Sequence, residues 1–275
     1  LTGRYVELNI YTLSFEEFLK FRKVLTGGRE IDVKKEFRIF LRSGGFPVLQ
    51  VAEYTNETEA KVVYDIFSSI LLNDVVRRNN IRDVELLGRV VRYMFDNTGN
   101  RFSAKKVADY FKSQQRKIDL NTIYNYLEAL EGSYILYRIP RYDIKGKEIL
   151  KTLEKYYAGD PALINAVMGY KDRHIAGMLE NIVMLELMRR GYKVYTGRSE
   201  EKEIDFIADR NDARIYVQVS FRMESQATID REFNPLLEIR DHYPKYVVTM
   251  DDIWHDNIEG IRHVHIADFL LKEEW

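Results

Sequence analysis

The stretch EIDFIADRNDARIYVQVS, residues 203–220, decides which fold class this sequence indicates. Its two halves are rich in β-branched and aromatic residues, which predicts one strand over 203–208 and another over 214–221. Asn211 and Asp212 lie between the strands and are typical turn residues, so we expect a hairpin. Such a hairpin brings Asp205 beside Gln218, at the end of the second strand.

The sequence around this hairpin alternates between helical and extended patterns. A helix over 174–190, closed by Gly191, and a strand over 192–196 come before it. A helix over 228–240, strands over 246–250 and near 263–266 and a final helix come after it. Strands interleaved with helices predict an α/β domain over residues 158–275.

Residues 101–157 have a different order of elements. Ser103 can cap one helix, and Asp119 or Asn121 can cap the next. A strand that Pro140 stops, a turn over 144–147 and a return strand follow. Helix, turn, helix and hairpin is the order of a winged helix-turn-helix module.

Positive charge is concentrated in this middle part. Residues 1–100 carry 15 basic and 14 acidic side chains, residues 101–151 carry 11 and 6, and residues 152–275 carry 16 and 23. If the module binds DNA, the second helix enters the major groove and the wing meets phosphates. The residues then expected at the DNA are Thr122 and Asn125 near base edges, and Arg116, Lys117, Arg141, Lys145 and Lys147 near the backbone. The alternative is that the module only joins domains or binds protein.

The first hundred residues are predicted to be mainly helical. A strand is expected over 4–10, and Ser14 and Glu17 have the spacing of a capping box. Asp32 can cap a second helix, and a further helix starts near Asn56. The fold class is therefore multidomain, α+β or α/β. Its predicted parts are the end of a preceding domain core (1–25), a helical lid or linker bundle (26–100), the winged helix-turn-helix (101–157) and the α/β domain (158–275).

A cluster of oxygen ligands is the strongest candidate for chemistry. Gln218 and Ser220 share one face of their strand because side chains alternate, and the hairpin brings Asp205 next to them. Glu180 lies on the preceding long helix. Carboxylate and amide oxygens suit Mg²⁺, which can activate water against a phosphodiester. The tentative metal ligands are Asp205 and Gln218.

These residues resemble the active-site pattern of the PD-(D/E)XK, or restriction-endonuclease-like, superfamily. Glu180, Asp205 and Gln218 match the helix glutamate, the aspartate and the following acidic or amide position. Ser220 stands where the family has a lysine. In the family that lysine orients the attacking water, so the resemblance implies a nuclease-like domain with a degenerate, inactive site. The alternative is an active nuclease in which Arg222, or a lysine from elsewhere, takes its place.

The wider chain resembles the C-terminal region of archaeal and bacterial AAA-family ATPases. The resembling stretches include Leu1–Tyr5, Gly44–Pro47, Leu71–Val76 and Tyr142–Lys147. The resemblance implies that residues 1–25 end an ATPase core and that ATP binds only in the upstream domain. This chain itself lacks a Gly-x-x-x-x-Gly-Lys-Ser/Thr loop.

Three functions compete on these observations. The first is a DNA-binding module of an ATPase with an inactive nuclease-like domain, the second is an active Mg²⁺-dependent nuclease, and the third is a protein-interaction or assembly domain that touches no nucleic acid. The partners expected are DNA and the protein's own N-terminal ATPase domain, with the oligomeric state left open. No apolar run is long enough for a membrane span, and cysteine is absent, which fits a cytoplasmic protein.

Overall fold

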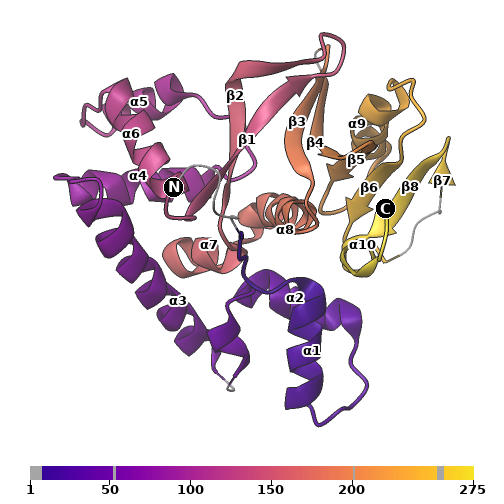
Figure 1. The fold of residues 1–275 in the computed structure, drawn as a ribbon, viewed down its shortest axis with the longest axis horizontal. Coiled ribbons are helices and arrows are strands. Elements are labelled where there is room, and N and C mark those ends of the chain that lie inside the picture. The colour runs from indigo at the N-terminus through magenta and orange to yellow at the C-terminus, as the bar shows by residue number, and fades with distance from the viewer. Residues whose placement is uncertain (1–7, 52–53, 201, 253–256) are drawn as a thin grey trace.

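The computed structural model describes residues 8–51, 54–200, 202–252 and 257–275, and it shows a mixed α/β protein (Figure 1). Ten α-helices, three short helical turns and eight strands lie in these residues. In chain order they are α1 (Phe15–Leu25), α2 (Val33–Ser43), η1 (Pro47–Gln50), α3 (Asn56–Ile70), η2 (Leu71–Arg77), α4 (Val84–Asp96), α5 (Ala104–Ser113), α6 (Leu120–Glu131), β1 (Leu136–Asp143), β2 (Glu148–Ala158), α7 (Pro161–Met168), η3 (Asp172–His174), α8 (Ile175–Arg189), β3 (Lys193–Ser199), β4 (Lys202–Arg210), β5 (Ala213–Val219), α9 (Gln226–Leu237), β6 (Lys245–Thr249), β7 (Asn257–Ile258), β8 (Ile261–His265) and α10 (Ile266–Leu271).

Among the first hundred residues, those that the structure describes are mainly helical, as predicted. Ser14 and Glu17 form both hydrogen bonds of the capping box, and the Asp32 side chain caps α2. The cap of α3 is Thr55, one residue before the predicted start. The strand expected over 4–10 lies partly outside the described residues, and residues 8–10 have no regular structure.

The middle part contains the predicted helices and hairpin. Ser103 caps α5, and Asp119 rather than Asn121 caps α6. The prediction that Pro140 ends the first strand is wrong, because β1 runs through Pro140 to Asp143. The pairing with β2 is irregular between Ile139 and Arg141, so a residue without an N–H is tolerated there.

The hairpin belongs to the main sheet. One eight-stranded sheet has the order β2-β1-β3-β4-β5-β6-β8-β7. Strand β1 pairs with β3 in parallel, but only over Arg141–Asp143 and Thr196–Arg198. Beyond these three pairs the two halves of the sheet diverge like a fork, and α8 lies between their lower ends (Figure 1). The sheet thus continues across the border expected between residues 157 and 158.

The strands and helices predicted after residue 170 are present, and the turn at Asn211 and Asp212 joins β4 to β5 as expected. Helix α7 was not predicted. Helix α8 packs with Phe206 and Val217 in one core, whereas Phe233 and Leu236 of α9 pack with Ile207 in a second core. The central strands are therefore covered on both faces. None of the described helices is both long and apolar enough to cross a membrane.

Candidate active site at the fork of the sheet

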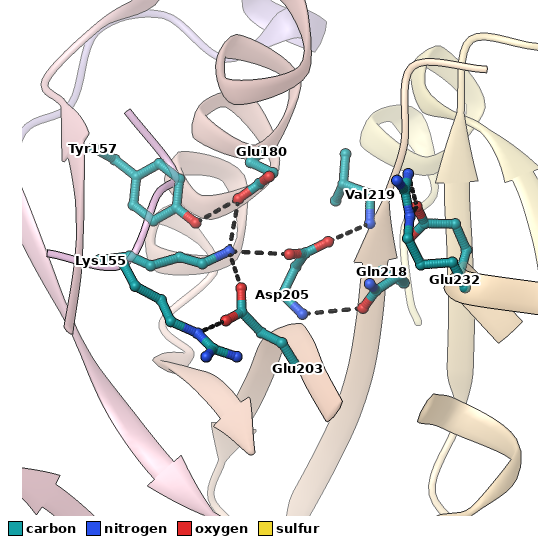
Figure 2. A network of polar contacts seen from close by, with 10 residues as sticks. Lys155, Tyr157, Glu180, Glu203, Asp205, Gln218, Val219 and Glu232 are labelled. Carbon is teal, nitrogen blue, oxygen red and sulfur yellow. Dashed lines mark hydrogen bonds and ion pairs between the residues drawn. The ribbon is translucent and has the colours of Figure 1, made fainter. Parts of the chain in front are cut away.

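Asp205 and Gln218 are neighbours on adjacent antiparallel strands. The Asp205 N–H donates to Gln218 Oε1 over 3.1 Å, and the Val219 N–H donates to Asp205 Oδ2 over 3.0 Å. Both residues are only 7% exposed. The prediction that the hairpin brings these two residues together is confirmed by this geometry (Figure 2).

A β-bulge places Asp205 at this point. Between Tyr195 and Gly197 strand β3 advances two residues, whereas β4 advances three, from Ile207 to Ile204. The extra residue of β4 changes the alternation of side chains at Asp205. Bulges are common next to active sites because they redirect a side chain in this way.

Glu180 faces Asp205 from α8. Its Oε2 accepts hydrogen bonds from the Tyr157 hydroxyl at 2.8 Å and from Lys155 Nζ at 3.1 Å. Burial and the negative charge of Asp205 raise the pKa of Glu180 to about 8, and the contacts with Lys155 and Tyr157 only partly oppose this. Glu180 therefore holds a proton at neutral pH unless another cation joins the cluster.

Lys155 is the residue that links the carboxylates. Its ammonium group lies 3.1 Å from Glu180 Oε2, 2.8 Å from Glu203 Oε1 and 3.0 Å from Asp205 Oδ1. The side chain is 2% exposed and comes from β2, on the opposite arm of the fork (Figure 2). Between Ile139 and Arg141 strand β1 advances two residues and β2 advances five, so Lys155 lies directly after an irregularity in the β1–β2 pairing.

Lys155 is not among the candidate residues expected from the sequence. The one feature of the sequence that points to Lys155 is its position directly before Tyr156, Tyr157 and Ala158, an apolar run that the structure buries. A local pattern does not show that β2 and β4, separated by β1 and β3 in the sheet, face each other across a fork.

Among the described residues the charges of the cluster balance only while Glu180 keeps its proton. Glu180, Glu203 and Asp205 are three carboxyl groups, and the cations bound to them are Lys155 and Arg101, which pairs with Glu203. Burial raises the pKa of Glu232, and so does the negative charge of Asp205, so the acidic field reaches α9.

A pocket of about 510 Å³ opens onto the carboxylates. Helices α8 and α9 and the ends of β4 and β5 form its walls. Its polar lining residues are Glu180, Lys202, Glu203, Asp205, Gln218, Ser220, Asp230, Arg231, Glu232 and Asn234. Lys155 is not among the described lining residues and thus lies behind the carboxylates. Ser220 lines the pocket, whereas Arg222 pairs with Glu224 and lines a different cavity.

The residues suit Mg²⁺ only in part. No group of three or more His, Cys, Asp or Glu side chains is arranged to hold a metal ion within the described residues. Mg²⁺, however, often uses one or two carboxylates and completes its shell with water and substrate oxygens. Asp205 and Glu180 are such a pair at the pocket. Gln218 lines the same pocket, and its Oε1 accepts one hydrogen bond, from the Asp205 N–H, so Gln218 stays a predicted ligand.

The residues expected to meet DNA are not gathered on one surface. Arg116 pairs with Asp83 and Glu85, and Lys145 pairs with Glu200. Lys145 and Lys147 lie in the β1–β2 turn, far from α6, which carries Thr122 and Asn125 (Figure 1). Arg141 is buried at the β1–β3 junction, and its Nε has no hydrogen-bond partner in the described structure. Lys117 and Asn125 are exposed.

Comparison with known proteins identifies a family. Residues 34–174 match a domain of unknown function, DUF8612. The chain belongs to the DUF8612 family. The DUF8612 segment includes Lys155 and Tyr157 but ends before Glu180.

Two relatives match almost the whole chain. An uncharacterised protein of Haemophilus influenzae is 38% identical over 273 residues, which are 99% of this chain and 66% of that protein. An uncharacterised protein of Methanocaldococcus jannaschii is 28% identical over 289 residues, covering 100% of this chain and 64% of that protein. This DUF8612 chain thus spans slightly less than two thirds of their length. No solved structure matches it.

Proposed function

We propose that this chain hydrolyses phosphodiester bonds of nucleic acid with the help of a divalent metal ion. The observation that carries the proposal is the ammonium group of Lys155, which lies within 3.1 Å of Glu180 and Asp205. The nuclease-like pattern of this chain has Ser220 at the position where the family has a lysine. Lys155 brings a positive charge to the same carboxylates from another strand.

The proposed role of each residue depends on whether its side chain lines the pocket. Asp205 and Glu180 line it and would hold the ion. Lys155 is a positioning residue, because it orients both carboxylates and offsets their repulsion from behind. Lys202 and Arg231 line the pocket with side chains 41% and 70% exposed, so they are the cations that can meet a substrate phosphate.

A bound Mg²⁺ would supply a Lewis acid that lowers the pKa of water and neutralises charge on the phosphate. Asp205 is prepared for this role because the Val219 N–H holds its Oδ2 and Lys155 holds its Oδ1. Glu180 must release its proton to bind the ion. Metal affinity should therefore increase as the pH rises towards the Glu180 pKa of about 8.

One observation favours the binding-only function instead. Lys155 already neutralises part of the carboxylate charge, and the proton on Glu180 can remove the remainder. A cluster balanced in this way can persist without a metal ion. In that case the domain would bind nucleic acid without cutting it, which is the function first expected from Ser220.

The test is cleavage of a mixed pool of DNA and RNA with Mg²⁺ or Mn²⁺ present, beside metal-free binding of the same pool. We expect metal-dependent cleavage that Asp205→Asn abolishes and that Lys155→Met lowers about 10²-fold or more. Asp212→Asn removes an exposed carboxylate from the turn of the same hairpin and should leave the rate unchanged.

The possible results separate the two functions. Binding without cleavage, equal in wild type and in Asp205→Asn, would refute hydrolysis and support the binding-only domain. Cleavage that persists in Asp205→Asn would show that the activity does not come from this pocket.

We further propose that the longer protein is an AAA-family ATPase with DNA as a partner, as the resemblance implies. The relatives continue beyond the matched region for roughly a third of their length, which leaves room for an ATP-binding core. Titration of this chain with Mg-ATP should then show no saturable binding. Stoichiometric binding of Mg-ATP by this chain alone would contradict the proposal that ATP binds in another part of the longer protein.

A further inference from the structure

A second hollow lies in the helical part of the molecule, away from the carboxylate pocket. It has a volume of about 380 Å³, which is within the range of small-ligand sites. Helices α2, α3 and α7 and the turn η1 form its walls, and all its lining residues fall within the DUF8612 segment. The polar residues that matter are Arg42, Asn56, Glu57, Glu59, Asn165 and Tyr170.

Asn165 presents an acceptor that no group in the described structure satisfies. Its Nδ2 donates to the backbone carbonyls of Leu41 at 3.3 Å and Arg42 at 2.8 Å, at the end of α2. Because two carbonyls require the NH₂ group there, the orientation of the amide is fixed. Its Oδ1 is buried without a donor, although the residue is 9% exposed and lines the hollow. A buried acceptor without a donor costs about 1–3 kcal/mol, so it favours a ligand that supplies an N–H.

The charges of the lining also favour a donor. Glu57 and Glu59 line the hollow together with a single cation, Arg42. Glu59 forms no hydrogen bond or ion pair with the described residues, and burial raises its pKa despite the attraction of Arg42. The Arg42 guanidinium lies 5.5 Å from the centre of the Tyr170 ring, so it packs against the wall.

We propose that this hollow binds a guanidinium group, as the head of a small molecule or of an arginine side chain from a partner. A guanidinium carries several N–H donors in one plane, so it can pair with the Glu59 carboxylate and still have N–H groups left to donate. Asn165 Oδ1 has almost no accessible surface in this structure, so a hydrogen bond to it requires the neighbouring side chains of the lining to move. The positive charge of the guanidinium offsets the excess of carboxylates in the lining. This site does not depend on the proposed nuclease function.

The experiment is a calorimetric titration of the whole chain with methylguanidinium and with its uncharged analogue N-methylurea. We expect saturable 1:1 binding of methylguanidinium and no saturable binding of N-methylurea. Glu59→Gln should weaken binding about 10- to 100-fold, the effect of losing one charge-assisted hydrogen bond. Ala60→Phe, which fills the hollow from an exposed helix position without changing any charge, should abolish it.

Asp65→Asn is the matched control, because it removes one carboxylate from an exposed position of the same helix α3 outside the lining. It should bind like wild type. Absence of saturable methylguanidinium binding to the wild type would overturn the proposal. Equal weakening by Asp65→Asn and Glu59→Gln would also overturn it, since the attraction would then be a general effect of surface charge.

A third titration distinguishes the two sources of the group. Acetyl-Gly-Arg-Gly-amide should bind more tightly than methylguanidinium if the partner is a protein segment. If the free cation binds at least as tightly as the peptide, the site serves a small molecule.

Discussion

Replacing Lys155 by Met tests the centre of the site. The substitution keeps most of the side-chain volume but removes the positive charge. The Lys155 side chain is 2% exposed, and its ammonium group lies within 3.1 Å of three carboxyl groups. Removing one partner of a buried ion pair typically costs about 3–5 kcal/mol, because the remaining charges stay buried without compensation. For a chain of this size that loss corresponds to a decrease of about 6–20 °C in the melting temperature.

The loss should depend on pH in a predictable direction. Glu180 already has a raised pKa, and without Lys155 its protonated form is favoured further. The destabilisation in Lys155→Met should therefore be smallest at pH 5 and largest above pH 8. Urea unfolding followed by circular dichroism at pH 5, 7 and 8.5 measures this. Lys145→Met removes a lysine that is 66% exposed, and it should change stability by less than about 0.5 kcal/mol.

A double-mutant cycle completes the test. Glu180→Gln in the Lys155→Met background removes the carboxyl group whose raised pKa costs stability at high pH, so it should recover part of the lost stability, with a coupling of about 0.5–3 kcal/mol. The reasoning is wrong if Lys155→Met unfolds within about 1 kcal/mol of wild type at pH 8.5. It is equally wrong if the loss is independent of pH and Glu180→Gln adds a further loss.

Three other perturbations address single features. In wild type the contribution of Glu180 to stability is greatest below the usual glutamate pKa of 4.5, and at most about 5 kcal/mol of it is lost as the pH rises to about 8. Urea unfolding of Glu180→Gln at several pH values should lack this part of the pH dependence. A Cβ at Gly197 would lie 3.0 Å from side-chain atoms of Ile204 and Ile207 across the bulge. Gly197→Ala should therefore lower the free energy of unfolding in urea by about 1–3 kcal/mol and slow cleavage. Full cleavage activity in this variant would show that the bulge is not needed for the function. If the β1–β2 turn contacts phosphates, changing Lys145 and Lys147 together to Ala should make the plot of log binding constant against log salt concentration less steep by about 1–2 for duplex DNA. An unchanged slope would exclude this turn from the DNA interface.

Local structure could largely be predicted from neighbouring residues. Helix starts at Ser14, Asp32, Ser103 and Asp119 were predictable because a cap depends on a side chain and the amides within the next three residues. The β4–β5 hairpin was predictable for a similar reason, since a turn residue and alternating strands act within about ten residues. The pairing of Asp205 with Gln218 followed directly from that hairpin.

How these local parts combine depends on contacts between residues far apart in the chain. Arg141 was predicted as a wing residue, but the parallel pairing of β1 with β3 buries it inside the main sheet. Lys155 meets Asp205, fifty residues later in the chain, because β1 and β3 pair over three residues and then separate. Pairing between strands that are distant in sequence depends on which apolar faces can be buried together. Neither residue carries that information in its own neighbourhood, so the contact of Lys155 with Asp205 follows only from the arrangement of the two arms of the fork.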